Sequence, residues 1–561
     1  MTANNSFIAN QFSLLSKLLE LHGDNPFKVR AYSSAARLID KLPQEISKLP
    51  PGKLASIKGI GDSVAKKIKE IFDYGEIKAL TELVHKTPPG VLEMLKVKGI
   101  GAKKIAVIWK KMGIENVGEL LYACNENRLT RYSGFGEKTQ EAIQESIEYY
   151  LNNIGSYLYA RVEDLAAALD QILKKQFKKY QFFQTGDIRR HLEVIDKLEW
   201  VTDAPAASLQ SFLGKNNFAA EKLDAEQSIF RGKSDNTQLI FYHASSGQLY
   251  QKLFLTSASD EFLQAWNKKS RFKKSESYAS EEEIFSSAKV KFIPAYLRET
   301  AEIIERARKN DLPVVIQPED ITGIIHCHSK WSDGLNTIEE MAEVAIEKGL
   351  QYLVISDHSK TAIYANGLSE ERIQAQHEQI DELNKKLKPF RIFKSIESDI
   401  LNDGSLDYPP DVLARFDLVI ASIHSNVKMS EDKAMARLLN AVKNPFTSIL
   451  GHCTGRLLLS RNGYPVRYNE LIDACAKHNV AIELNANPRR LEIDWRHINY
   501  CLEKKVLISI DPDAHSTGAF DHTRYGVLAA QKAGVTKANN LSSFSLKEFE
   551  GFLKKQHAKR K

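Results

Sequence analysis

The sequence has few cysteines and no long apolar run, and each absence excludes a class of protein. Five cysteines in 561 residues, none in a CxxC pair, exclude a disulfide framework and a zinc ribbon, so we expect reduced thiols. No apolar run reaches the roughly 18 residues of a membrane helix, and the N-terminus lacks the pattern of a signal peptide. We therefore predict a cytoplasmic protein without a membrane partner.

The formal net charge of +7 is a moderate excess that permits contact with nucleic acid without establishing it. Within the N-terminal region a short unit recurs, a Gly-hydrophobic-Gly turn followed by a basic amphipathic helix. Its copies are IKGIGDSVAKKIKEI at 57–71 and VKGIGAKKIAVIWKK at 97–111, with a weaker third copy, YSGFGEKTQEAIQESI, at 132–147.

Such a turn leaves backbone N–H groups available at a helix N-terminus, where phosphate oxygens bind favourably. We predict nonspecific, salt-sensitive binding to a nucleic-acid backbone, and the alternative is that the turns are plain structural caps. The predicted contacts are Gly59, Gly61, Lys66, Lys67, Gly99, Gly101, Lys103 and Lys104.

Seven short apolar runs lie in the C-terminal half, and six of them end in residue types that bind divalent metals. Helix-like stretches such as TIEEMAEVAIEKG at 337–349 separate the runs, which predicts parallel strands, crossover helices and a seven-stranded barrel. A single histidine near a strand end is usually structural, but so many ligand types at one rim favour a metal site. The candidate ligands are His326, His328, Asp333, His358, Glu397, His424, His452, Asp513 and His515.

The spacing of these residues predicts which side chains share a face. In His326-Cys327-His328 and Asp513-Ala514-His515 the ligands are two positions apart, so in an extended chain both project to one side, while Cys327 packs in the wall. Mixed imidazole and carboxylate ligation suits Mn, Zn or Fe better than Mg, and clustered metals favour hydrolysis of phosphate esters. Arg456 and Arg489 are candidates to bind substrate phosphate, with a surface or structural role as the alternative.

The motifs HCHSKWSDG, SDHS, IESD, ASIHS, GHCTGRLL and DPDAHS, in this order, resemble those of the PHP (polymerase and histidinol phosphatase) family over residues 320–545. The resemblance implies a distorted (βα)7 barrel that holds three divalent metals. We expect Glu397, Asp513, Arg489 and Arg456 to be the catalytic residues. The resemblance places His326, His328, Glu397 and Asp513 on one metal, Asp333, His358 and His515 on a second, and His424 with His452 on a third, with Glu397 bridging.

The N-terminal half carries a second resemblance. DNPFKVRAYSSAARLIDKLP at 24–43 and SEEEIFSSAKVKFIPAYLRE at 280–299 resemble the lyase and thumb parts of family X DNA polymerases, over residues 1–315. In bacteria that module is typically followed by a PHP domain, so the whole chain resembles a bacterial PolX-type protein. The resemblance puts Lys67 at the Schiff-base position of a sugar-phosphate lyase, with Lys28 and Tyr32 near it.

The expected architecture is therefore multidomain, with helical helix-hairpin-helix domains, an α+β palm and thumb, and an α/β barrel. We predict a lyase-like helical domain at 1–85, a fingers-like helical domain at 86–155, a degenerate palm at 156–245, a thumb-like domain at 246–318 and the barrel at 319–561.

The palm departs from the family X pattern, in which a GS-x-RR segment precedes an Asp-x-Asp pair. In TGDIRRHLEVIDKLEWV at 185–201 both arginines remain, but Asp187 replaces the serine, and the aspartate pair falls on Lys197 and Glu199. The strand QLIFYHA, which should carry a third aspartate, has none. Because nucleotidyl transfer needs carboxylates to hold two Mg ions, we predict a palm that retains its fold but not its activity. A register that uses Asp196 or Asp203 is the alternative.

These patterns predict a DNA-binding, metal-dependent phosphodiesterase of DNA repair, a 3'-5' exonuclease that also cleaves abasic sites, acting at gaps or ends. Three alternatives stay open: an active family X polymerase with an exonuclease, a phosphatase of the histidinol-phosphate type, and a noncatalytic DNA-end scaffold.

Overall fold

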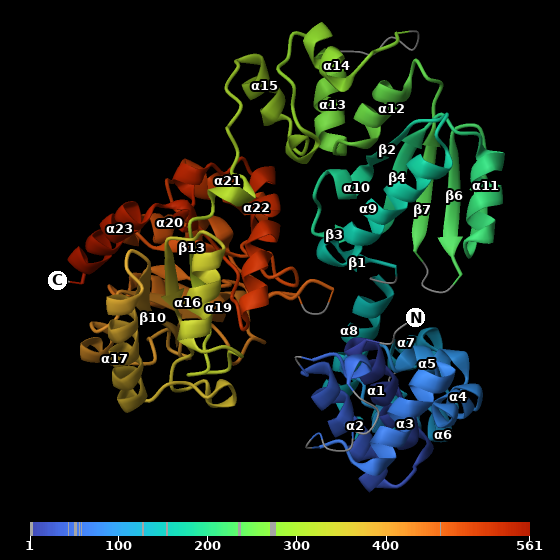
Figure 1. Cartoon of the computed structure of the whole chain (residues 1–561), viewed down its shortest axis with the longest axis horizontal. Coiled ribbons are helices and arrows are strands. Elements are labelled where there is room, and N and C mark those ends of the chain that lie inside the picture. The colour runs from blue at the N-terminus through green and yellow to red at the C-terminus, as the bar shows by residue number, and fades with distance from the viewer. Residues whose placement is uncertain are drawn as a thin grey trace. The chain divides into compact units, whose positions relative to one another are not determined.

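The computed structural model describes residues 4–42, 44–49, 53–54, 57, 59–125, 128–152, 155–233, 237–269, 276–459 and 462–560. The chain divides into two compact units, Met1–Ile154 and Gly155–Lys561 (Figure 1). Among the described residues, no helix combines the length and the apolar character needed to cross a membrane.

The first unit is helical, and its core is one apolar cluster that includes Phe12, Ile68 and Ile105. Asn4 and Asn25 cap the first two helices, each accepting a hydrogen bond from a backbone N–H of the first turn. The helices are α1 (Asn5–His22), α2 (Pro26–Asp40), α3 (Asp62–Tyr74), α4 (Lys78–His85), α5 (Pro89–Met94), α6 (Ala102–Met112), α7 (Val117–Asn125) and α8 (Glu137–Asn152).

The second unit begins with the part predicted as the palm, a five-stranded mixed sheet in the order β2-β4-β7-β6-β5. Apolar side chains on one face, among them Trp200 and Phe241 stacked at 5.5 Å, pack beneath α9 and α11. The elements are β1 (Tyr157–Leu158), α9 (Tyr159–Gln176), β2 (Phe182–Thr185), α10 (Gly186–Arg189), β3 (Val194–Ile195), β4 (Lys197–Thr202), α11 (Ala206–Lys215), β5 (Phe218–Leu223), β6 (Gln227–Gly232) and β7 (Gln238–His243).

A short helical part, predicted as the thumb, connects the palm to the barrel. Its core packs Phe254, Phe262, Trp266 and Phe285 around the fully buried side chain of Arg298. The helices are α12 (Leu249–Thr256), α13 (Asp260–Lys269), α14 (Glu281–Ser287) and α15 (Glu302–Arg308).

The C-terminal part is a parallel seven-stranded sheet in the order β14-β13-β12-β11-β10-β9-β8. The two edge strands, β8 and β14, approach each other through a parallel backbone β-bridge between Cys327 and Ala514, so the barrel is nearly closed. The predicted multidomain fold with a (βα)7 barrel is thereby confirmed. The elements are β8 (Gly323–Cys327), α16 (Ile338–Glu347), β9 (Tyr352–Ile355), α17 (Glu370–Lys386), β10 (Arg391–Asp399), α18 (Pro410–Leu413), β11 (Leu418–Ser422), α19 (Glu431–Lys443), β12 (Ile449–Leu450), α20 (Tyr468–His478), β13 (Ala481–Asn485), α21 (Trp495–Glu503), β14 (Ile508–Asp511), α22 (Thr523–Lys532) and α23 (Leu546–Ala558).

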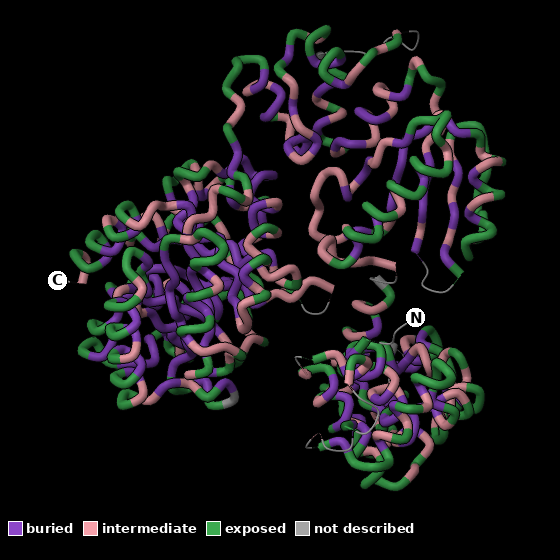
Figure 2. Tube along the Cα trace, in the orientation of Figure 1, coloured by how far each residue is buried: buried purple, intermediate pink, exposed green. Residues whose placement is uncertain are grey.

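The barrel strands are buried apart from Arg391 and Lys394 of β10, which is why their sequences are nearly continuous apolar runs (Figure 2). One cluster of strand residues, including Ile325, Val354 and Ile420, packs with Phe549 and Leu553 of α23. A second cluster packs the helices against the outside of the sheet. The polar residues that end the strands are therefore left together at the carboxyl end of the barrel.

Candidate functional site

All nine candidate ligands lie together at the carboxyl end of the barrel, linked by short nitrogen–oxygen distances. Glu397, at the end of β10, is the centre of the group. Its carboxylate lies 2.8 Å from His452 Nε2, 2.9 Å from His358 Nδ1 and 3.1 Å from His424 Nε2. Asp513 lies 3.2 Å from His328 Nε2. Strand ends that are far apart in the sequence thus supply one polar cavity.

The loop after β8 brings Asp333 into the group. Gly334 lies so close to the carbonyl of His328 that a Cβ atom would come within 2.0 Å of its oxygen. This close approach folds the loop back, and Asp333 lies 3.6 Å from His358 Nε2 and 3.4 Å from His515 Nε2.

The backbone at two of these positions differs from the extended chain that the sequence predicts. His326 has a φ of +60° and Asp513 a φ of +49°, and the pairing of β8 with β9 shifts between Ile324 and Cys327. A left-handed residue in a strand re-aims the side chains around it. Cys327 does pack in the wall, fully buried, with its thiol donating to the carbonyl of Val354 at 3.2 Å.

Among the described residues, three groups have donor atoms close enough to share an ion, and their membership differs in part from the predicted partition. His328 joins the predicted set of Asp333, His358 and His515. Glu397 groups with His358 and His424, and His452 belongs to none of the three, although it contacts Glu397. The groups are His328, Asp333, His358 and His515; His326, His328 and Asp513; and His358, Glu397 and His424. These clusters are consistent with several divalent metals.

Two acidic residues that the sequence reasoning missed orient the rings. His326 Nδ1 hydrogen-bonds to Glu483 of β13, which leaves Nε2 facing Glu397 at 3.3 Å. His424 Nδ1 lies 2.7 Å from Asp399 Oδ1 in the same way. A carboxylate behind each ring is the usual support of a metal-binding histidine. The run VAIELNANP could have pointed to Glu483, because an acidic residue inside an apolar strand needs a buried partner.

The electrostatics of the cluster fit cations. Burial raises the pKa of Glu397, but His424, His326 and His358 outweigh it and hold that pKa well below its ordinary value. Burial, reinforced by His358, lowers the pKa of His328 to about 3, so the imidazole is neutral and has a lone pair to donate. Within the described structure, the buried atoms His326 Nε2 and Glu397 Oε2 have no hydrogen-bond partner. An ion among these atoms would supply the missing contacts.

The predicted phosphate-binding arginines lie in different surroundings. All three nitrogens of the Arg456 guanidinium donate within the protein, to Asp494 and to the carbonyls of Arg490 and Leu491, which favours its structural alternative. Arg489 is exposed. Its neighbour Arg490, missed by the sequence reasoning, lies with Nε 3.8 Å from Asp513 and Nη1 3.2 Å from Glu492.

A cleft of about 630 Å³ adjoins the cluster on the side of His424. Its lining includes Thr361, Leu401, Asn402 and Asp403. This volume is in the range of small-molecule sites, so the cleft gives a substrate access to the candidate metals.

In the palm, the residues at the family X carboxylate positions contact one another. Glu199 is 3% exposed, lies 3.0 Å from Lys197 Nζ and accepts a hydrogen bond of 2.7 Å from Tyr242 of β7. Burial, with Glu199 as the next cause, raises the pKa of Asp187. Both arginines are paired as well, Arg189 with Glu281 and Arg190 with Glu299.

The two glycine hairpins of the first unit have the same geometry. Gly59 and Gly99 have φ values of +99° and +90°, and Gly61 and Gly101 cap α3 and α6 without any side-chain hydrogen bond. A Cβ atom on Gly61 or Gly101 would meet nothing within 4 Å, so the helix N-termini are open.

The predicted lysines lie on the helices that these turns begin. Lys66 and Lys103 are exposed, while Lys67 and Lys104 are partly buried. Lys67 Nζ lies 3.7 Å from Glu70, and Tyr32 hydrogen-bonds to Ser63 at 2.9 Å. The contacts of Lys67 leave its lyase role a prediction.

Three family models match the chain. Residues 3–77 match a helix-hairpin-helix domain, residues 91–148 a SAM-like helix-hairpin-helix tandem and residues 325–487 the PHP domain. The chain is 34% identical over 556 residues to the DNA polymerase/3'-5' exonuclease PolX of Bacillus subtilis (strain 168), covering 96% of this chain and 97% of that protein.

Two probable phosphatases are similar to a smaller part of this chain. A probable phosphatase of Caldanaerobacter subterraneus is 30% identical over 170 residues, which are 28% of this chain and 60% of that protein. A probable phosphatase of Thermoanaerobacter sp. (strain X514) is 28% identical over 225 residues, 38% of this chain and 86% of that protein.

Proposed function

The chain belongs to the PolX family, and from this membership we propose that it is a DNA-binding, metal-dependent 3'-5' exonuclease whose palm no longer transfers nucleotides. Cleavage at abasic sites by the same metals, in DNA repair, is part of the proposal. The observation that carries it is the nine-residue cluster around Glu397 at the carboxyl end of the barrel.

Divalent metals held there, Mn, Zn or Fe in three positions, would lower the pKa of a bound water and neutralise charge on the phosphoryl group. The chain contributes the ligands and their orientation. Glu397 is ionised, His328 is neutral, and Glu483 and Asp399 fix the rings of His326 and His424. Arg490, beside Asp513, is the arginine placed to pair with a phosphate oxygen.

Support for an inactive palm comes from Lys197 and Glu199. Lys197 Nζ, 3.0 Å from the buried Glu199 carboxylate, already supplies a cation there, and Tyr242 of β7 donates a hydrogen bond to the same carboxylate. Arg190, in the arginine pair that the palm shares with family X, is held by Glu299 through two hydrogen bonds of 3.0 and 2.5 Å. Binding of two Mg ions and a triphosphate would have to displace all of these pairs.

Helix-hairpin-helix domains and membership of the family imply DNA binding. We propose that the open N-termini of α3 and α6 bind phosphates at gaps or ends without reading sequence, with the lysines that follow Gly61 and Gly101 adding charge. Lys67 remains the proposed Schiff-base residue of any lyase activity.

One assay tests the proposal. The protein is incubated with Mn²⁺ and a duplex whose recessed strand is labelled at its 5' end, with and without dNTPs. We expect stepwise shortening from the 3' end and no extension. A matched His326→Ala protein should leave the strand intact, and equal shortening by both proteins would reject the barrel as the nuclease.

Two observations favour alternative functions of the protein. The Bacillus relative is named for polymerase as well as exonuclease activity, and extension that Glu199→Ala abolishes would establish an active palm. The probable phosphatases that match part of the chain point to phosphomonoesters, and hydrolysis of histidinol phosphate much faster than of DNA would favour that activity. A purified protein without any bound transition metal would favour the noncatalytic scaffold.

A further inference from the structure

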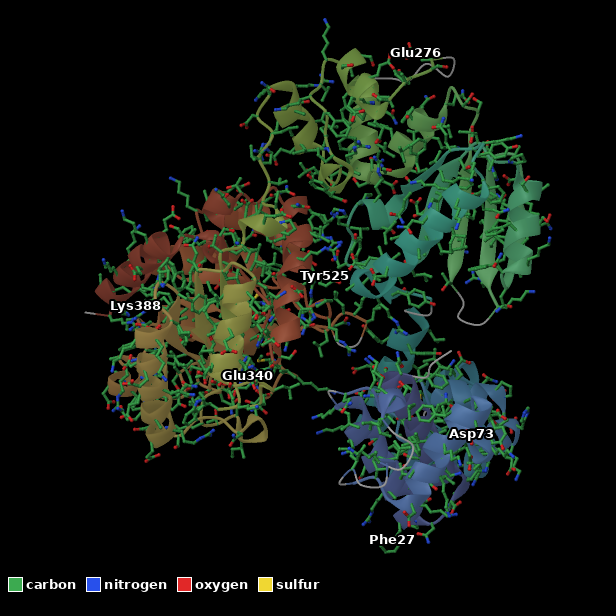
Figure 3. The ribbon with its side chains drawn as sticks, in the orientation of Figure 1. Phe27, Asp73, Glu276, Glu340, Lys388 and Tyr525 are labelled. Atoms are coloured by element: carbon green, nitrogen blue, oxygen red, sulfur yellow. The ribbon has the colours of Figure 1, made fainter. Side chains whose placement is uncertain are left out.

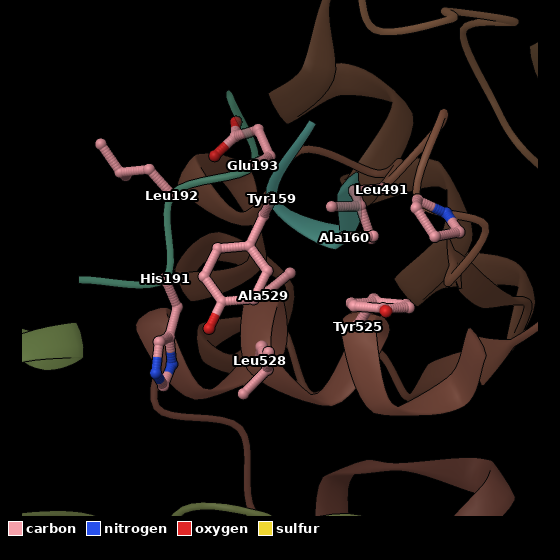
Figure 4. Close-up of a pocket in the computed structure, with 10 residues that line it drawn as sticks. Tyr159, Ala160, His191, Leu192, Glu193, Leu491, Tyr525, Leu528 and Ala529 are labelled. Carbon is pink, nitrogen blue, oxygen red and sulfur yellow. The ribbon is translucent and has the colours of Figure 1, made fainter. Parts of the chain in front are cut away.

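Within the second unit, the palm and the barrel meet along a packed seam (Figure 4). Tyr159 and Ala160 of the palm line this seam together with Leu491 and Leu528 of the barrel. The cavity between them is about 10 Å³, room for one water at most, so the seam is a direct contact and not a ligand site. Leu192 packs against the apolar cores of both parts.

Two acidic residues of the palm bind the barrel across this seam, at different elements. Glu163 accepts hydrogen bonds of 2.8 and 2.6 Å from Arg524 and one of 2.5 Å from Tyr525, both on α22. Figure 3 labels Tyr525. Glu193 accepts hydrogen bonds of 3.2 Å from Trp495 Nε1 and 2.9 Å from Arg496 Nη1, both at the start of α21.

The start of α21 is joined directly to the loop of residues 486–494, which places Arg490 beside the candidate ligand Asp513. Asp494 caps the helix by accepting from the backbone N–H of Arg496. The same carboxylate accepts a hydrogen bond of 2.6 Å from Arg456. Arg456 in turn donates to the backbone carbonyls of Arg490 and Leu491. Glu193 is therefore linked to Arg490 through four consecutive polar contacts.

Backbone hydrogen bonds and strand pairing hold Glu193 in place on the palm. The backbone carbonyl of Glu193 accepts from Tyr159 N–H at 3.1 Å, and β3, which pairs with β1, follows at once. Nearby, the fully buried Nζ of Lys532 on α22 donates to Glu299 at 2.6 Å and to the carbonyl of Arg190 at 2.7 Å. A buried cation with two such partners holds one geometry, because losing either partner would leave it uncompensated.

We propose that Glu193 is a positioning residue for the phosphodiesterase reaction: the palm braces the 486–494 loop and so fixes Arg490 beside Asp513. This rests on the proposed function of the barrel, and it gives the palm a role that needs no nucleotide chemistry. The second contact, through Glu163, binds α22 and takes no part in the four polar contacts that lead from Glu193 to Arg490, so it supplies a matched control.

The test compares full-length Glu193→Ala, Glu193→Gln and Glu163→Ala proteins. Hydrogen exchange is measured at Arg490, Leu491 and Ile493, whose N–H groups bond to the carbonyls of Asn487 and Glu483. We expect faster exchange there in Glu193→Ala alone, and a smaller change in Glu193→Gln, which can still accept from Trp495. Exchange on α22 should rise in Glu163→Ala instead.

Hydrolysis of bis(p-nitrophenyl) phosphate with Mn²⁺ is the second readout, because this small diester needs no DNA binding. Glu193→Ala should lose about 10-fold in kcat with KM within about twofold, since a displacement of about 1 Å can cost up to about 100-fold. Glu163→Ala should stay within about twofold of the unmodified protein. Unchanged loop exchange in Glu193→Ala would overturn the inference. A wild-type protein that does not hydrolyse the diester would defeat the proposed function, while exchange would still decide the role of Glu193.

Discussion

Glu397 is the residue on which the barrel site depends, because imidazoles from four other segments face its two oxygens. Its distances to His326, His358, His424 and His452 are 3.3, 2.9, 3.1 and 2.8 Å. A buried carboxylate that faces four imidazoles cannot be replaced by an amide without losing charge balance.

We expect Glu397→Gln to lower the bound metal content and to reduce diester hydrolysis by at least about 100-fold, because the amide keeps the size of the side chain but not its charge. Metal analysis and the Mn²⁺-dependent rate are the measurements. Glu378→Gln, a change of the same kind on the exposed face of α17, should alter neither. Full metal content in Glu397→Gln would show that Glu397 is not a ligand.

His191 makes the seam sensitive to acid. Burial, then the charges of Lys532 and Arg524, lower its pKa to about 4, against an ordinary value of about 6.5. The folded state therefore binds fewer protons than the unfolded chain between these values. The stability that neutral His191 contributes is present above about pH 6.5 and is lost as the pH falls toward 4, by up to about 3 kcal/mol.

The test of this pH dependence is His191→Asn, because asparagine tolerates the φ of +56° at this position. Between about pH 7 and about pH 5, we expect the melting temperature of the unmodified protein to fall further than that of the variant. Parallel falls would show that other groups dominate the acid response.

The sequence predicts the site residues that the barrel strands position, but it does not show which arginine a loop turns toward the site. Eight of the nine candidate ligands lie in or just after strand ends, so period and length were enough to place them together, while Asp333 lies in the loop after β8. Arg489 and Arg490 are neighbours with the same side chain, and only the path of residues 486–494 decides that Arg490 faces Asp513. Glu483 was missed because the sequence shows a carboxylate inside an apolar strand but not which buried partner it contacts.

At the scale of elements, the barrel was predictable because seven buried runs alternate with amphipathic stretches. The local departures of the barrel from regular strand geometry were not predictable. The left-handed residues His326 and Asp513 depend on the near closure of the barrel, where the N–H of His328 donates to the carbonyl of Ala514 at 2.8 Å. That contact joins residues from opposite ends of the barrel sequence, which local spacing cannot show.

The hairpins lead to a prediction about an element terminus. Gly101→Glu would place a negative charge at the open N-terminus of α6, where a DNA phosphate is proposed to bind. Since such terminal charge effects are worth about 1 kcal/mol, the dissociation constant for gapped DNA should rise roughly 3- to 10-fold. Gly101→Ala is the matched control, because a Cβ atom there meets no other atom and φ is −76°. Equal binding by both variants would mean that the turn is only a structural cap.

At the scale of the whole molecule, the sequence predicted the parts but not which of them belong together. The palm and the barrel are described as one compact unit, although Glu163 and Arg524 are 361 positions apart. No local pattern reports a contact of that separation. The bounds of the five predicted domains stay predictions, while the division of the chain into two compact units falls between Ile154 and Gly155.

The division of the chain into two units predicts that the second unit carries the hydrolytic site and the first contributes to DNA binding. A protein of residues 155–561 keeps the braced barrel but lacks both glycine hairpins. We expect its hydrolysis of bis(p-nitrophenyl) phosphate to match that of the full chain, because the metals and the 486–494 loop are retained. Its KM for a DNA 3' end should rise by at least about 10-fold, and its KM should depend less on salt, because phosphate contacts have been removed. Kinetics of both substrates at two salt concentrations are the measurement. If the shorter protein lost activity equally on the diester and on DNA, the hairpin unit would be needed for the chemistry itself and not only for binding.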